Sequence, residues 1–210
     1  MADDYYASFG TVDLTRLEVL DRTMGVLKAF GAQFDVDLFE LQLVDGRFEY
    51  TNREIQDRSI WYGLERTVDW QGIEFHMTLF ERGCSMLFLN SQSANTTVVF
   101  VEPAGLISDQ AAHPLLEVML FELLAKLVDA LNANFCVVEP GWTCRERTLS
   151  DIEVWARDTS VGRPRDWVHV LLVQGDWSER IWQYVSSQYE RRAVGRLLWF
   201  HKKRRTEQRS

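Results

Sequence analysis

Apolar positions follow two different periods along this chain, and the changes of period predict its elements. From Leu14 to Leu27 the large apolar side chains recur at spacings of three and four, which predicts a helix over residues 13–30. Between residues 39 and 101 apolar and polar positions tend to alternate, which predicts an antiparallel β-meander. Turn signals divide this meander at Asp45-Gly46, Gln71-Gly72 and Arg82-Gly83.

A second helical pattern covers residues 110–131 and is apolar around most of its circumference. We expect this helix to lie against the sheet as the central element of the core. Residues 135–138 and 167–173 are typical of strands. Between them, Ser150-x-x-Glu153 has the form of a capping box and predicts the start of a short helix.

The end of the chain permits two interpretations. After Gly175 an apolar stripe from Trp182 to Phe200 predicts a last helix, and a strand over residues 192–200 is the competing interpretation. Helices and strands are grouped rather than strictly alternating, which is typical of the α+β class. The expected order is an N-terminal helix, a mostly antiparallel β-meander covered by a central apolar helix, and then β-α-β-α.

Charge is distributed unevenly. The formal net charge is −8, but residues 186–210 carry eight Lys/Arg and two Asp/Glu, whereas the other 185 residues carry 15 and 29. We therefore expect a single α+β domain over residues 1–200 with an acidic surface, followed by a basic tail over residues 201–210. An acidic body repels nucleic acid and anionic lipid, and attracts basic proteins.

The cysteines and the N-terminus bear on the compartment. Cys84, Cys136 and Cys144 form no CxxC pair, so neither a disulfide framework nor a zinc site is predicted. The N-terminus is acidic and lacks the basic start and apolar core of a signal peptide. No uninterrupted apolar run approaches the length of about 18 residues that a membrane span needs. These features predict a cytoplasmic protein.

Motifs of common catalytic sites are absent from the sequence. It has no G-x-S-x-G elbow, no P-loop, no G-x-G-x-x-G and no H-E-x-x-H. One enzymatic hypothesis pairs Cys84 with His76 on a neighbouring strand, because a cysteine nucleophile needs a base. A buried, unreactive Cys84 is the simpler interpretation. No cofactor and no metal site are predicted.

Three acidic residues precede or open the meander. Asp35 and Asp37 would share one face of a regular strand, and Glu40 follows them. Such carboxylates are suited to a divalent cation in a nuclease-like or hydrolase-like site. They are equally suited to docking onto the Arg or Lys of a protein partner. We predict the second role for Asp35, Asp37 and Glu40.

Tryptophan is concentrated in the final third, where six of the eight lie between Trp142 and Trp199. Trp142 and Trp177 stand in predicted turns, where burial is not guaranteed. Because Trp is enriched in the energetic centres of protein interfaces, both are predicted to bind a partner. The alternative is that these rings fill the core.

The basic tail contains Lys202, Lys203, Arg204 and Arg205. Three interpretations stay open. The tail could contact phosphates, it could serve as a basic signal of the nuclear-import type, or it could be the solvated end of a helix whose macrodipole favours cations.

These features together favour a non-catalytic protein-binding role. The predicted function is an immunity-type, antitoxin-type or chaperone-like factor whose acidic surface binds and neutralises a basic partner such as a toxin. The order of elements is also similar to that of secretion-chaperone-like folds. Two alternatives remain: a small hydrolase or nuclease with a dispersed site, and a nucleic-acid or host-factor binder acting through the basic tail.

Overall fold

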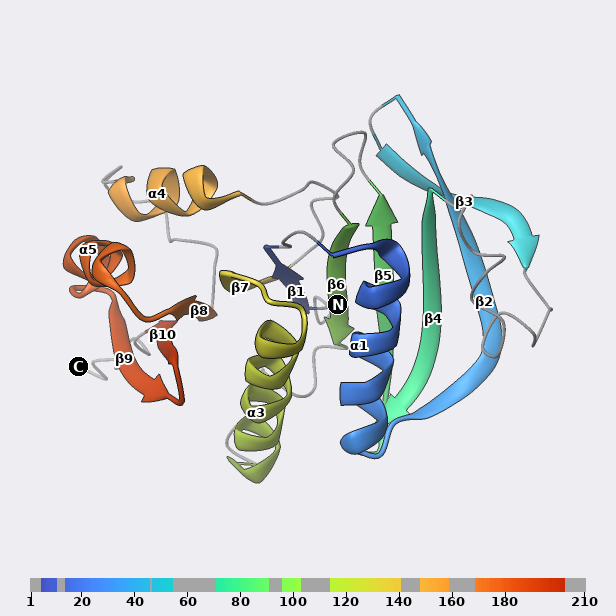
Figure 1. Cartoon of the computed structure of the whole chain (residues 1–210), viewed down its shortest axis with the longest axis horizontal. Coiled ribbons are helices and arrows are strands. Elements are labelled where there is room, and N and C mark those ends of the chain that lie inside the picture. Colours follow the sequence, from blue (N-terminus) through green and yellow to red (C-terminus); the bar gives the residue numbers. More distant parts are fainter. Residues whose placement is uncertain are drawn as a thin grey trace, which may run out of the picture.

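The computed structural model describes residues 5–10, 14–45, 47–54, 71–90, 96–102, 114–140, 148–158 and 169–202. Within these ranges the chain forms four helices and one antiparallel sheet of ten strands (Figure 1). The strands are β1 (Tyr5–Phe9), β2 (Gln33–Val44), β3 (Arg47–Glu54), β4 (Gly72–Leu79), β5 (Arg82–Asn90), β6 (Thr96–Glu102), β7 (Phe135–Pro140), β8 (His169–Val173), β9 (Tyr189–Val194) and β10 (Leu197–Lys202). The helices are α1 (Arg16–Ala29), α3 (Pro114–Ala130), α4 (Leu149–Arg157) and α5 (Asp176–Val185). The predicted α+β class is confirmed.

The first strand of the chain joins two halves of the sheet. The strand order is β3-β2-β4-β5-β6-β1-β7-β8-β10-β9, so β1 lies between the meander and the C-terminal strands. Within β1, Ala7 pairs with Phe100 of β6 on one side and with Val138 of β7 on the other. The meander was predicted, whereas β1 was missed because five residues of mixed polarity carry little periodic signal.

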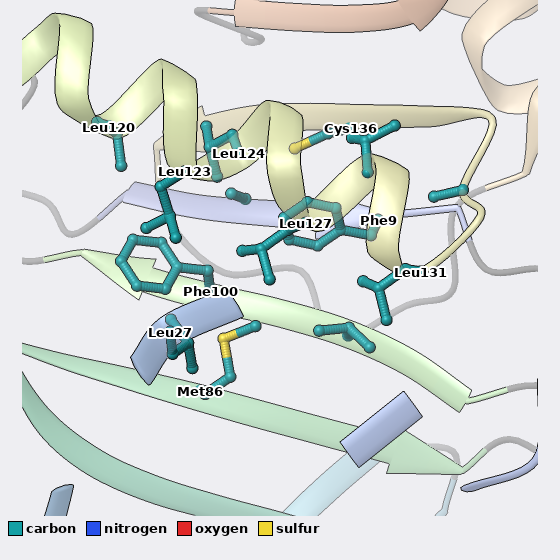
Figure 2. Close-up of a cluster of buried hydrophobic side chains, with 14 of the residues drawn as sticks. Phe9, Leu27, Met86, Phe100, Leu120, Leu123, Leu124, Leu127, Leu131 and Cys136 are labelled. Atoms are coloured by element: carbon teal, nitrogen blue, oxygen red, sulfur yellow. The ribbon is translucent and has the colours of Figure 1, made fainter. Parts of the chain in front are cut away.

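Helices α1 and α3 cover one face of the sheet, called here the α1/α3 face. The apolar stripe of α3 is buried from Leu120 to Leu131, and Leu27 of α1 meets the same core. Figure 2 shows these leucines above Phe9, Met86 and other strand side chains. The prediction that the apolar helix at residues 110–131 packs on the sheet is therefore correct for its described part, α3.

The opposite face, called the α4/α5 face, is covered differently in its two halves. On β7, β8 and β10, helices α4 and α5 close a core that contains Ile152, Ile181, Tyr189 and Phe200. On the meander, the buried cluster of this face consists of strand residues only: Leu41, Leu87, Leu89 and Val99. The C-terminal half thus has helices on both faces, whereas on the meander the described helix packing is limited to the α1/α3 face.

Capping fixes where the helices begin. The Thr15 side chain accepts from the Glu18 N–H, and Glu18 accepts from the Thr15 N–H. The Thr15 hydroxyl also donates to the Glu18 carboxylate, and the two bonds that this carboxylate accepts, the one from the backbone first, lower the pKa of Glu18. In α4 the capping box is formed by Thr148 and Asp151. The predicted Ser150–Glu153 box is therefore wrong by two residues, although the helix itself is present.

The helix predicted to run to Phe200 is wrong beyond Val185. Residues 189–202 form the β9–β10 hairpin, in which Val194 pairs with Leu197. Gly195, in the intervening turn, has φ +57°, a left-handed conformation that glycine adopts at low cost. A spacing of four, as from Tyr189 to Ala193, suits both a helical stripe and one face of a strand. The competing interpretation, a strand over residues 192–200, is correct in type, but a turn at Gly195 divides these residues between two strands.

The β4–β5 turn lies two residues earlier than predicted. It is made by Phe80 and Glu81, whose φ values of +52° and +62° are left-handed, and β5 begins at Arg82. Left-handed φ at both central positions suits the twist of a tight hairpin. The Phe80 ring packs edge-on against Phe30 at 6.3 Å between centroids, so a tertiary contact accompanies this unfavoured backbone.

The C-terminal boundary also differs from a free tail starting at residue 201. His201 and Lys202 are the last residues of β10 and pair with Glu190 and Tyr189. Lys203, Arg204 and Arg205 lie outside the described residues. Across the described part of the chain, no helix combines the length and apolarity needed to cross a bilayer.

Candidate functional site

A β-bulge separates the acidic residues at the start of β2. The register with β4 shifts between Phe34 and Leu38. Asp35 lies on the α4/α5 face beside His76, whereas Glu40 pairs with buried Ile73 of the α1/α3 face. Asp37 lies in the bulged segment itself. The bulge therefore does not bring Asp35 and Glu40 together, and no metal-binding group of three acids, His or Cys occurs among the described residues.

Asp35 instead belongs to a row of side chains that crosses the sheet. His76 pairs with Ser85, and Ser85 pairs with Val101, which places residues of β4, β5 and β6 side by side. The row continues through Tyr6 of β1. Asp35 stands at the β2 end of this row, because its neighbour Phe34 pairs with Met77.

A shallow hollow of about 280 Å³ lies along this row. It is called here the Asp35 pocket, and it is lined by Asp35, His76, Met77, Gly83, Cys84, Ser85 and Val101. Asp35 is exposed, and no ion pair or hydrogen bond of its carboxylate occurs among the described residues. The pocket thus combines an unpaired anion with an apolar wall and one hydroxyl.

That hydroxyl belongs to Ser85, which is 9% exposed. No described side chain hydrogen-bonds to Ser85, although its strand neighbours His76 and Val101 flank it in the register. A nearly buried hydroxyl can donate one hydrogen bond and accept two. The Ser85 hydroxyl lines the Asp35 pocket, so the hydrogen bonds that no described side chain uses are open to a group in that pocket.

The buried carboxylate of Glu74 stabilises the side chains next to the Asp35 pocket. Glu74 is 5% exposed; Tyr50 donates a short hydrogen bond to its Oε2, and His76 Nε2 lies 3.3 Å from its Oε1. The Phe39 ring packs against His76 at 5.1 Å between centroids and edge-on against Tyr50. Burying a charge is costly unless it is paired and hydrogen-bonded, and these contacts meet that condition.

Sequence reasoning missed Tyr50, Glu74 and Ser85. A usable signal exists in β4, where Glu74, His76 and Thr78 alternate with apolar residues and therefore share one face. The partner residues come from other strands, and only the register shows that Ser85 faces His76.

The enzymatic hypothesis that pairs Cys84 with His76 is wrong. Cys84 pairs in register with Met77 and is buried at 5% exposure in the core of the α1/α3 face. The His76 side chain is 46% exposed and points to the opposite face, because successive side chains alternate. Cys136 is also buried, and burial raises the pKa of its thiol. The simpler interpretation, a buried Cys84 thiol, is correct.

Trp177 is half-buried at the start of α5, and Trp142 lies outside the described residues. The Trp177 indole N–H donates to Glu153 Oε1 at 3.1 Å and so joins α5 to α4. Its ring packs against the C-terminal core. This contact gives Trp177 a structural role; its predicted partner-binding role stays a prediction.

Basic residues near the C-terminus are matched by acids. Arg191 lies 2.7 Å from Glu179, Arg196 contacts Asp129, and His201 Nε2 lies 3.1 Å from Glu190. Arg191 also stacks on Trp182. The β9–β10 hairpin therefore presents less net positive charge than the sequence count suggests.

His169 is a buried imidazole in the C-terminal half. The Trp199 indole donates to its Nδ1 at 3.2 Å, and its Nε2 is buried with no partner among the described residues. Burial, the larger cause, and the neighbouring His201 together lower the pKa of His169 to about 3. His169 is therefore neutral at ordinary pH.

Comparisons with known proteins give no family. No family model and no curated protein matches the sequence. The Pseudomonas aeruginosa T6SS protein PA0821 is similar over 95% of this chain, with a TM-score of 0.43 and 13% identity, and this chain covers 64% of that one. The PH1012 protein from Pyrococcus horikoshii OT3 is similar over 59% of this chain and 89% of its own, with a TM-score of 0.24 and 11% identity. Likenesses at this level assign no function.

Proposed function

We propose that this chain is a non-catalytic binding protein of the immunity, antitoxin or chaperone-like type. In this proposal it docks a basic partner onto the meander half of the α4/α5 face, centred on the Asp35 pocket. The observation that carries the proposal is Asp35 itself: an exposed carboxylate without a described partner, at the rim of a hollow.

The charge distribution supports a basic partner. Glu179, Asp129 and Glu190 are matched with bases, whereas Asp35 has no partner within the part of the chain that the structure describes, and unpaired charges are those that a partner can use. The excess of 29 acids over 15 bases outside residues 186–210 adds a long-range attraction for cationic surfaces.

Aromatic side chains beside the pocket support a protein partner. Tyr50 is 57% exposed and Phe39 is half-buried, and the two rings contact each other. Tyrosine is enriched in the energetic centres of interfaces because it offers a large contact area with few rotatable bonds. The hydrogen bond to Glu74 holds the Tyr50 ring in place before any partner arrives.

Co-purification from the native host tests this proposal. Wild type, Asp35→Lys and the control Glu122→Lys are compared; Glu122 is exposed on α3, which covers the other face, and takes the same change of charge. We expect wild type and E122K to retain one basic protein, and D35K to bind it at least about tenfold more weakly. The complex should also weaken between about 0.05 M and about 0.5 M NaCl. A basic partner held equally by D35K would contradict the site.

An immunity-type role also requires that the partner be toxic. Expressed alone, the partner should arrest growth of a host cell, and co-expression of wild type or E122K should restore growth. D35K should fail to restore it, because the docking contact is lost. A captured protein that is harmless and unfolded when alone would favour the chaperone-like form of the proposal instead.

A further inference from the structure

We propose that the Asp35 pocket receives an arginine side chain of the basic partner and discriminates it from lysine. This inference rests on the proposed function and adds to it the chemical group that is recognised. Three features of the pocket carry it: an anion and a nearly buried hydroxyl, neither with a partner among the described residues, and a shallow hollow with an apolar wall.

The anion is Asp35. A carboxylate accepts two parallel hydrogen bonds from a guanidinium, a geometry that an ammonium cannot reproduce. The competing carboxylate nearby, Glu74, is already bonded to Tyr50 and close to His76.

The hydroxyl is Ser85, nine-tenths buried and without a hydrogen-bond partner among the described residues. Asp35 and Ser85 lie on β2 and β5, with β4 between them. Two inter-strand spacings separate their Cα atoms by about 10 Å. A compact ammonium bridges acceptors only about 6 Å apart with two bonds of about 2.9 Å. A guanidinium presents its donors over a wider span and comes closer to bridging both acceptors than an ammonium does.

The walls and size of the pocket suit one side chain. Val101 offers apolar surface to an aliphatic stem, and the His76 ring, packed on Phe39, offers an aromatic face. Guanidinium groups stack on aromatic faces better than ammonium groups do. A volume of about 280 Å³ is below the range of pockets that enclose drug-sized molecules, roughly 300–1,000 Å³.

Two peptides of equal length and charge test the inference: a capped decapeptide of alternating Gly and Arg, and its Gly–Lys counterpart. Isothermal titration measures the affinity of each for wild type, Ser85→Ala, Asp35→Asn and the control Glu122→Gln. We expect wild type and E122Q to bind the arginine peptide at least about tenfold more tightly than the lysine peptide. S85A should reduce that preference to about threefold or less, because one acceptor is lost. D35N should weaken binding of both peptides.

Amide and imidazole NMR shifts locate the contact. Titration with the arginine peptide should move the signals of Ser85 and His76 in wild type, and S85A should retain its fold and melting temperature. Equal affinity for the two peptides, with D35N weakening both, would overturn arginine selectivity and leave the docking proposal standing. Affinity for the arginine peptide that neither D35N nor S85A changes would remove the pocket as its site, whatever the co-purification shows.

Discussion

The two halves of the α4/α5 face differ in what covers them and in how their charges are matched. On the C-terminal half, α4 and α5 bury the sheet, and the neighbouring bases are paired with acids. On the meander half, the described cover is limited to strand residues, and Asp35 is left unpaired beside a hollow. Formal net charge is therefore a poor guide to binding, because ion pairing within the protein decides which charges a partner meets.

The largest expected effect tests whether the C-terminal half is a packed core. Phe200 is fully buried and contacts the Trp182 ring. Phe200→Ala should lower the free energy of unfolding by about 3–5 kcal/mol, because a large cavity is left. Urea denaturation measures this loss. Val154→Ala on exposed α4 is the control and should stay within about 0.5 kcal/mol of wild type. A loss below about 1 kcal/mol for F200A would show that the C-terminal half is not a packed core.

The next effect concerns acid stability and the neutral imidazole under α3. The pKa of His169 is lowered to about 3 by burial, while an unfolded histidine titrates near 6.5. Below about pH 6.5 the unfolded chain therefore binds a proton that the folded chain refuses, and stability falls as pH falls towards 3.

The variant His169→Gln should remove this acid-dependent loss, because Gln keeps an acceptor for Trp199 without a titrating group. Between pH 6.5 and pH 5, wild type should lose about 2 kcal/mol more than H169Q. Urea denaturation at each pH, referenced to pH 8 for each protein, measures the difference. Parallel pH curves for the two proteins would show that His169 is protonated in the folded state.

A smaller effect tests the buried carboxylate of the meander half. Tyr50→Phe removes the donor to Glu74, which is 5% exposed. Because Tyr50 is itself 57% exposed, water can replace part of that bond, and we expect a loss of about 1 kcal/mol. Tyr184→Phe on α5, 48% exposed, is the matched control and should cost less. Equal losses for the two variants would mean that Tyr50 does not stabilise Glu74.

Much of the fold was predictable where periodicity is long or a turn is unambiguous. The helix around Leu120–Leu131 follows from its apolar stripe, and β2 and β3 meet at the predicted Asp45 turn. The β4–β5 turn was misplaced because Phe80 and Glu81 take left-handed φ without glycine or asparagine. Nothing local marks such a turn, since the contact that accompanies it comes from α1.

The candidate site was predictable only in part. Asp35 was singled out from the sequence. The bulge that places Asp35 and Glu40 on opposite faces of the sheet has no sequence signal of its own. Ser85 and Tyr50 meet Asp35 and Glu74 through strand register, which depends on the whole sheet rather than on neighbours in sequence. Sequence reasoning therefore found the anion of the pocket and missed the groups that give it a shape.

The smallest effect asks whether the pairing of the hairpin bases contributes to stability or only to the surface charge. Arg191 and Glu179 are both exposed and lie 2.7 Å apart. A double-mutant cycle with Arg191→Ala and Glu179→Ala should give a coupling energy of about 0.5 kcal/mol, the usual value for a solvent-exposed ion pair. Glu179→Gln should at the same time leave Arg191 as an unpaired base, and affinity for an anionic probe such as heparin should rise while the unfolding free energy barely changes. If heparin affinity is unaltered, the pairing does not mask the hairpin, and the contrast between a free acid at Asp35 and matched bases on β9 loses its meaning for binding.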